Sequence, residues 1–164
     1  MDISVDGSLI GKLIIELYAD KVPRTAENFR MLCTGEKGVG RSGAKLHYKD
    51  NKFHKIIPGF LCQAGDFIAN DGSQNESVYG PKFEDENFSI AHDSRGIVSM
   101  ANNGRNSNGG QFFITLRAAP WLNGKNVAFG KVVEGLDLLD KMEKAGTSSG
   151  CIRKVVRIIN CGEI

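Results

Sequence analysis

The chain has 164 residues, which favours one domain with a core large enough to be stable without disulfides or metals. Hydrophobic residues make up 41% and charged residues 24%, a globular composition that excludes a disordered chain. The 21 Lys and Arg against 19 Asp and Glu give a net charge of +2, which is too small to predict nucleic acid or a membrane surface as a partner.

Glycine is enriched, with 20 residues in 164, about 12% against a usual ~7%. This excess indicates many tight turns and favours short strands over long helices. Apolar runs such as Leu13–Ile15 are too short to cross a bilayer. The segment Met1–Ser4 has neither the basic region nor the apolar stretch of a secretory signal. We therefore expect a cytoplasmic protein, or a nuclear one, with reduced cysteines.

In the first third of the chain, residues 3–18 predict two strands separated by an Asp6-Gly7 turn, because apolar residues alternate on both sides of it. A helix is expected over Pro23–Thr34, where the proline suits the first helical position and Gly35 supplies the stop. Residues 35–52 show no periodicity and contain four glycines. A loop this long is either functional or a sign of a missed element.

The remaining elements are short. Strands are expected over residues 53–57, 60–68, 97–101, 111–116, 127–133 and 155–161, and a helix over 136–144 that Gly146 ends. Seven or eight short strands with a helix near each end predict a mainly β fold, a small antiparallel barrel whose open ends the helices cover. A β-sandwich is the alternative.

Motifs for cofactors and metals are weak. Gly38, Gly40 and Gly43 have the spacing of a dinucleotide-binding fingerprint, but a helix precedes them where that motif needs a strand, so a mobile loop is the better interpretation. The three histidines and four cysteines show no metal-ligand spacing. We expect no metal and no cofactor, with buried thiols and surface imidazoles.

One group of apolar residues lies among polar residues next to predicted turns: Phe60, Leu61, Phe113, Trp121 and Leu122. Their polar neighbours in the sequence are Lys55, Gln63, Asn102 and Gln111. These apolar side chains either pack in the core or line a shallow pocket with a few hydrogen-bonding groups. A pocket of that kind suits a peptide or a small ligand.

At these residues the chain resembles the cyclophilins, the peptidyl-prolyl cis-trans isomerases that bind cyclosporin. The resemblance covers nearly everything from Ile3 to Cys161. It is carried by TAENFR (25–30), FHKIIPGF (53–60), GDF (65–67), FEDENF (83–88), SMAN (99–102), QFFIT (111–115) and FGKVVEG (129–135). It implies an eight-stranded antiparallel β-barrel capped by two α-helices, with residues 1–164 forming one isomerase domain.

The resemblance also implies roles for particular residues. The proline pocket would be formed by Phe60, Leu61, Phe113 and Leu122, with Gln63 and Asn102 bonding the substrate backbone. Trp121 matches the tryptophan that borders the cyclosporin site. The implied set of substrate and cyclosporin contacts is completed by Ala101, Asn103, Gln111 and Asn126.

Four positions depart from the family pattern. Lys55 stands where the family has its catalytic arginine. Leu61 replaces a usual methionine and Asn126 a common histidine, and Asn103 replaces the alanine at the entrance of the secondary pocket. We expect these departures to affect rate and sequence preference and to leave the fold unchanged.

The loop between Gly38 and Phe53 is longer than in most members and resembles that of the divergent-loop cyclophilins. Members of that group carry two cysteines and a glutamate linked to the insertion. The matching residues here are Cys33, Cys161 and Glu76. The resemblance therefore implies a possible redox pair, Cys33 and Cys161, with Glu76 as the residue linked to the loop.

The function that the resemblance implies is isomerisation of X-Pro bonds in proteins, assisting folding, by a cyclosporin-binding monomer. Rotation about an X-Pro bond breaks amide resonance against a barrier of about 18–20 kcal/mol and makes no covalent bond, so no nucleophile is needed. A proline-peptide binding module is the alternative, with weak catalysis because of Lys55. A scaffold without affinity for Pro peptides is a third possibility.

Overall fold

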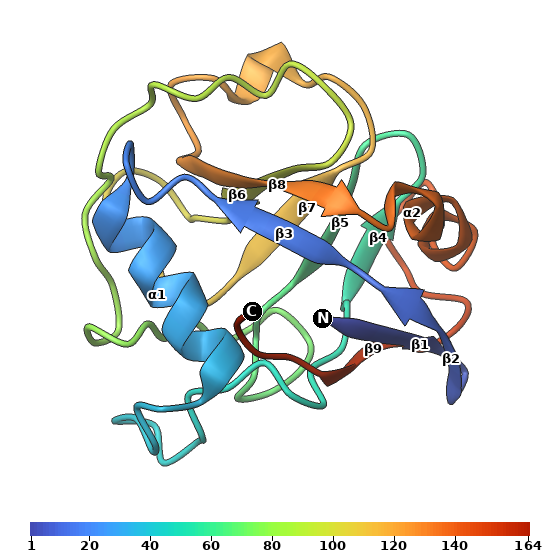
Figure 1. The fold of residues 1–164 in the computed structure, drawn as a ribbon, viewed down its shortest axis with the longest axis horizontal. Coiled ribbons are helices and arrows are strands. Elements are labelled where there is room, and N and C mark those ends of the chain that lie inside the picture. Colours follow the sequence, from blue (N-terminus) through green and yellow to red (C-terminus); the bar gives the residue numbers. More distant parts are fainter.

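The computed structural model describes all of residues 1–164, and its elements are mostly strands (Figure 1). The strands are β1 (Asp2–Val5), β2 (Ser8–Lys12), β3 (Ile14–Leu17), β4 (Lys55–Ile57), β5 (Leu61–Ala64), β6 (Ile97–Met100), β7 (Phe112–Thr115), β8 (Ala128–Glu134) and β9 (Val156–Asn160). The helices are α1 (Pro23–Thr34), α2 (Leu136–Glu143) and the short 3-10 helix η1 (Pro120–Leu122).

The strands form two antiparallel sheets, in the orders β2-β1-β9 and β3-β8-β6-β7-β5-β4. Buried Leu13 is the single residue between β2 and β3, so the chain passes directly from one sheet to the other at this edge. At the other edge, Phe53 N–H donates to Val156 O and Ile158 N–H donates to Asn51 O, both over 2.9 Å. These contacts join the sheets into a ring, and α1 and α2 lie on opposite sides of it (Figure 1). The expected mainly β, antiparallel architecture with two helices is confirmed.

Three element boundaries differ from expectation. Residues 3–18 form three strands, because the chain changes sheets at Leu13. The strand expected over 60–68 ends at Ala64, since Gly65 takes a φ of +100° and a Cβ there would lie 2.2 Å from Gly110 O. The second helix ends at Glu143, before Gly146.

Helix α1 begins as predicted at Pro23, and its cap comes from a distant loop. The carboxylate of Glu86 accepts the N–H groups of Arg24 (3.0 Å) and Thr25 (2.9 Å). A carboxylate is favourable there because the first N–H groups of a helix lack partners and carry partial positive charge. The helix ends at Gly35 in a left-handed conformation, φ +74°.

The side chain that fixes α1 to the barrel is Phe29. Its ring packs against three buried aromatic rings from the barrel and the long loop, at centroid distances of 5.3 Å (Tyr48), 5.1 Å (Phe112) and 5.0 Å (Phe129). These residues belong to a core of 27 buried apolar side chains. None of the helices has the length and apolarity needed to cross a membrane.

Candidate functional site

The register of three strands places key residues in one row across the larger sheet. Lys55 pairs with Gln63, and Gln63 pairs with Phe113. Phe113 in turn pairs with Ser99 on β6. Directly paired residues in antiparallel strands project to the same face, so these four side chains share one face of the sheet.

That face is the outer face of the barrel. The intervening residues, including Ile56, Cys62 and Ile114, belong to the main core, and strand side chains alternate between faces. On the outer face a second apolar cluster contains buried Leu61, Ala101 and Phe113. The partly buried side chains of Phe60 and Leu122 pack against it. The structure therefore brings together the residues expected to form the proline pocket, separate from the main core.

Trp121 extends this cluster outward. It lies on η1 with 47% of its surface exposed, and its ring centroid is 5.7 Å from that of Phe60. The guanidinium of Arg117 lies over the Trp121 ring, 5.3 Å from its centroid. The result is a shallow, open apolar surface bordered by one large aromatic ring.

The glutamines beside the cluster have different roles. Gln111 is buried and donates from Nε2 to Gly72 O (3.0 Å) and Gln74 O (2.8 Å). Its Oε1 accepts a hydrogen bond from Gln63 Nε2 over 3.0 Å. Gln111 therefore orients Gln63, and the Oε1 atom of Gln63 is left to accept from a ligand.

The asparagines near the cluster mostly brace loops. The side chain of Asn102 donates to Lys125 O over 2.9 Å, which leaves its backbone groups as the ones able to bond a ligand. Asn126 donates to Met100 O over 2.9 Å and so holds the end of β6. Asn103 is exposed, and its N–H donates to Ser107 Oγ over 2.9 Å.

Lys55 is exposed at the edge of this face, on β4. Its aliphatic stem lies along Gly150, where a Cβ would sit 3.0 Å from Lys55 Cγ. Gly150 has a φ of +88°, so both its conformation and its missing side chain make room for the lysine. The ammonium group is thus presented at the same face as Gln63 and Phe113.

The two cysteines of the expected redox pair lie elsewhere. Cys33 on α1 is buried, Cys161 is half-buried, and both are free thiols lining a cavity of about 590 Å³. This cavity lies between α1, β3 and the C-terminal segment, and none of the outer-face cluster lines it. Burial raises the pKa of Cys161 to about 11, and burial, with a smaller effect of Cys161, raises the pKa of Cys33 further.

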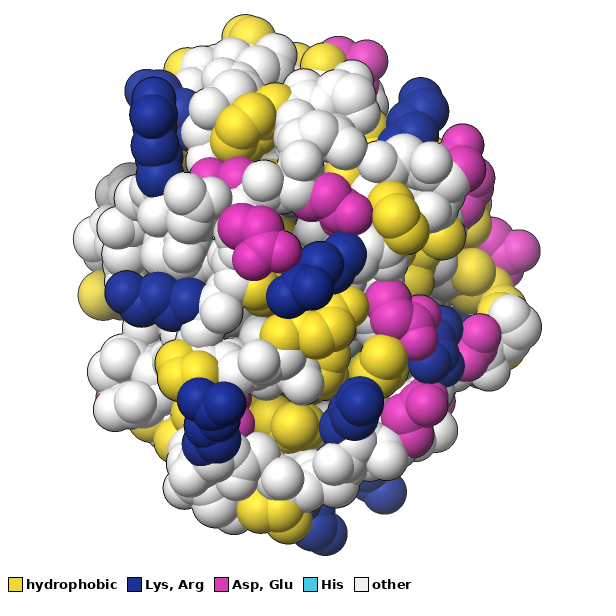
Figure 2. Space-filling view, turned by 90° about the vertical axis from the view of Figure 1, so that its left-hand side faces the viewer, with side chains coloured by type: hydrophobic (Ala, Val, Ile, Leu, Met, Phe, Trp, Pro, Cys, Tyr) yellow, Lys and Arg dark blue, Asp and Glu magenta, His cyan; other side chains and the backbone are white.

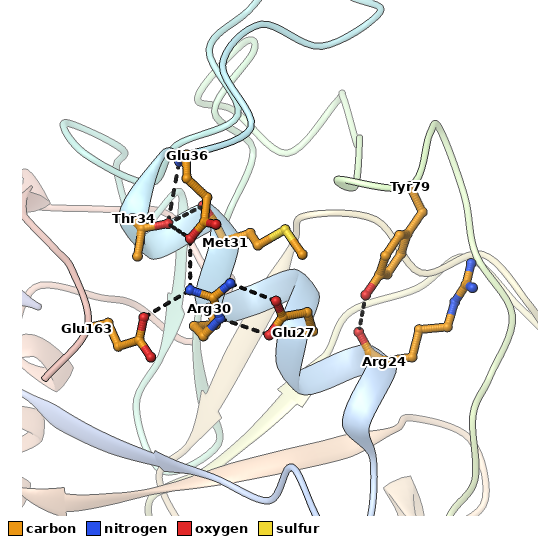
Figure 3. A network of polar contacts seen from close by, with 8 residues as sticks. All are labelled: Arg24, Glu27, Arg30, Met31, Thr34, Glu36, Tyr79 and Glu163. Atoms are coloured by element: carbon orange, nitrogen blue, oxygen red, sulfur yellow. Dashed lines mark hydrogen bonds and ion pairs between the residues drawn. The ribbon is translucent and has the colours of Figure 1, made fainter.

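A network around Arg30 holds the rim of that cavity (Figure 3). The guanidinium pairs with Glu27 (2.6 Å) on its own helix, Glu36 (2.8 Å) at the start of the long loop and Glu163 (2.9 Å) in the C-terminal segment. These bonds raise the pKa of Arg30 above its usual range. On the α1 side of the molecule, charged side chains of both signs are interspersed with apolar ones (Figure 2).

Glu76 contacts the long loop, as the resemblance implies for this position. Its buried carboxylate accepts the N–H groups of Arg41 (2.7 Å) and Ser42 (3.2 Å). Gly40 packs directly on it, since a Cβ there would lie 2.0 Å from Glu76 Oε1. A buried carboxylate satisfied by backbone N–H groups fixes the loop conformation.

Two expectations about titratable residues are wrong. His92 is fully buried, because a loop packs it against the apolar cluster, so it is no surface imidazole. Cys151 is exposed, so not all thiols are buried. Neither Ser99 nor His92 was expected near the site, because the sequence shows no spacing that links them. No group of three or more His, Cys, Asp or Glu side chains is placed to hold a metal ion.

A comparison with protein families agrees with the fold. The model of the family described as cyclophilin type peptidyl-prolyl cis-trans isomerase/CLD matches residues 1–163. The chain therefore belongs to the cyclophilin-type peptidyl-prolyl cis-trans isomerases. The resemblance read from the sequence motifs is confirmed.

Proposed function

We propose that this isomerase rotates X-Pro bonds of protein substrates at the outer-face cluster formed by Phe60, Leu61, Ala101, Phe113 and Leu122. The observation that carries the proposal is the strand register, which lines up Lys55, Gln63 and Phe113 on the face that bears this cluster. The apolar side chains bind the proline ring, and polar groups at the edge bind the flanking backbone.

The reaction needs a group that binds the twisted amide more strongly than the planar one. In the twisted state the prolyl nitrogen becomes pyramidal and regains a lone pair. The Lys55 ammonium donates towards that nitrogen, and a donor used only in the transition state lowers the barrier. Gln63 Oε1 and the Asn102 backbone hold the chain on either side, so rotation is confined to one side of the bond.

The open apolar surface of the cluster and the exposed ring of Trp121 support cyclosporin binding at the same place. We expect the fluorescence of Trp121, the only tryptophan in the chain, to change on titration with cyclosporin. We expect Asn126 to contribute least to cyclosporin binding, because its Nδ2 already donates to Met100 O and is not free to donate to the drug. A flat titration at micromolar drug with folded protein contradicts a cyclosporin site at Trp121.

The protein is further proposed to assist protein folding as a single-domain monomer in the cytoplasm or nucleus. One core of 27 residues, which runs from Ile3 to Ile158, supports a single domain over 1–164. Sedimentation analysis that gives a dimer mass contradicts the monomer.

The experiment that tests the proposal measures cis/trans exchange of an Ala-Pro peptide by NMR, with catalytic amounts of the protein and with cyclosporin added. We expect accelerated exchange that cyclosporin suppresses. Binding of the peptide without faster exchange would indicate the alternative, a proline-peptide binding module with weak catalysis because of Lys55. A scaffold would neither bind the peptide nor accelerate its cis/trans exchange.

A further inference from the structure

His92 is a fully buried polar side chain behind the outer-face cluster, on the loop before β6. Its ring stacks on that of Phe113, with centroids 6.0 Å apart and planes at 20°. Its Nε2 lies 2.8 Å from Ser99 Oγ, and Ser99 is the β6 partner of Phe113. His92 therefore contacts both the ring that forms the floor of the proposed proline site and the strand beside it.

The same residue holds both ends of η1, which carries Trp121 and Leu122. His92 O accepts the N–H of Ala119 over 2.9 Å, just before η1. Just after η1, Asn123 Oδ1 accepts from the His92 backbone N–H (2.8 Å) and lies 2.9 Å from His92 Nδ1. One residue thus joins η1, β6 and the Phe113 ring.

These bonds determine the tautomer of the neutral ring. A backbone N–H can only donate, so the Asn123 atom that it meets is the amide oxygen. That oxygen is an acceptor, and Nδ1 must therefore carry a hydrogen. In the neutral ring Nε2 is then an acceptor and takes the hydroxyl hydrogen of Ser99.

We propose that neutral His92, protonated at Nδ1, is a positioning residue that aligns η1 with the Phe113 ring, and that its protonation in mild acid disables the site. The inference rests on the proposed function of the outer-face cluster. In the imidazolium form Nε2 becomes a donor, so the hydroxyl hydrogen of Ser99 must turn away. The bond between His92 and Ser99 then reverses its direction and leaves the buried hydroxyl hydrogen of Ser99 without its acceptor, and a charge is buried against Phe113.

The surroundings of the ring favour its neutral form. Burial lowers the pKa of His92, while the bond to Asn123 and the charge of Asp93 oppose this effect. Asp93 is the charged group that acts on the ring, because Ser99, Phe113 and Asn123, which face it from β6, β7 and the end of η1, are uncharged. The acid loss of activity is therefore expected below the ordinary histidine value of 6.5.

The test compares pH profiles of kcat/KM for the parent and for Asn123→Asp. A carboxylate still accepts from both His92 N–H groups but stabilises the imidazolium, and an opposite charge at this distance raises a pKa by about one unit or more. We expect the acid midpoint of Asn123→Asp to lie about one pH unit or more above that of the parent. Asn160→Asp adds the same charge at an exposed residue of β9, in the other sheet, and should leave the midpoint in place.

His54 also has a pKa lowered by burial, but it has no bond to Asn123, so only a titration of His92 moves with that substitution. A parent profile that is flat down to pH 5, or a midpoint that Asn123→Asp leaves unmoved, overturns the proposal. The isomerase activity of the parent at pH 7.5, above the expected acid midpoint, tests the proposed function of the outer-face cluster separately from the role of His92. Ring ¹⁵N NMR reads the tautomer without turnover, and hydrogen on Nε2 in place of Nδ1 at pH 7 would overturn the proposal even for an inactive protein.

Discussion

At the scale of single residues, Lys55 distinguishes this chain from the family pattern. A lysine keeps the positive charge and a donor, but it lacks the planar fork that lets arginine bond a carbonyl and face the prolyl nitrogen together. The stem of Lys55 lies over Gly150, where φ is +88° and there is no side chain, and the stem of an arginine would follow the same path. We therefore expect the chemistry of the charged group at position 55, and not the packing of its stem, to determine the isomerisation rate.

We predict that kcat/KM on one X-Pro peptide follows the order Lys55→Arg, parent, Lys55→Ala. Removing a well-placed donor to a developing charge typically costs about 10²–10³ in rate, and the alanine variant should approach that loss. Cyclosporin affinity, which we propose to depend on the apolar cluster, should change much less. An alanine variant as fast as the parent would remove Lys55 from the mechanism.

Residue identity alone could predict which side chains gather on the outer face, because their motifs match the family. It could not predict how each of them bonds. The side chain of Asn102 is committed to Lys125 O, and Gln111 serves to orient Gln63, since both depend on loops that fold back from distant positions. His92 was overlooked for the same reason: its partners Ser99 and Asn123 are linked only by tertiary structure.

At the scale of elements, the buried carboxylate of Glu76 holds the part of the long loop around Arg41 and Ser42. We predict that Glu76→Gln loosens the loop, because an amide has one acceptor oxygen for the two N–H groups of Arg41 and Ser42. Loss of such a bond costs about 1–3 kcal/mol. Trypsin should then cleave after Arg41 about 5- to 150-fold faster, as that cost implies for loop opening.

The matched control is Glu84→Gln, which removes the same charge from an exposed ion pair with Arg24. Exposed pairs contribute about 0–1 kcal/mol, so this variant should be cut like the parent. Equal cleavage rates for the two variants would mean that Glu76 does not hold the loop.

The second prediction at this scale concerns Cys33 on α1 and Cys161 after β9, which line one cavity. We expect a disulfide between them only under added oxidant. The Cys161 pKa of about 11 leaves little thiolate at neutral pH, so the rate should rise about tenfold per pH unit below that value. Peptide mapping of oxidised protein that shows no link between Cys33 and Cys161 contradicts the pairing.

An effect of this bridge on the long loop has a direct structural route. The ring of His47, which lies in the loop, bonds the carbonyl of Cys33 over 3.1 Å. Any shift of the α1 terminus therefore moves His47 and the loop that Glu76 holds. Cys151→Ser keeps the pair and removes the exposed thiol, so it excludes a link through Cys151.

At the scale of the whole molecule, local patterns predicted the type of most elements but not how the sheets join. Alternation identified the strands, and Pro23 and Gly35 marked the ends of α1 correctly. The break at Leu13 has no local signal, because the run of alternating residues continues through it. The chain changes sheets there so that the ring can close, and closure is a property of the entire barrel.

The central claim is that X-Pro bonds turn over on the outer-face cluster, and kcat/KM for a proline tetrapeptide tests it most directly. The comparison is between the parent, Phe60→Ala and Phe88→Ala, since both phenylalanines are partly exposed but only Phe60 belongs to the cluster. Removing an apolar side chain from a binding surface costs about 1.5–3 kcal/mol. We predict that Phe60→Ala lowers kcat/KM about tenfold or more and that Phe88→Ala matches the parent. A parent no faster than the uncatalysed reaction, or equal losses in the two variants, would contradict the account.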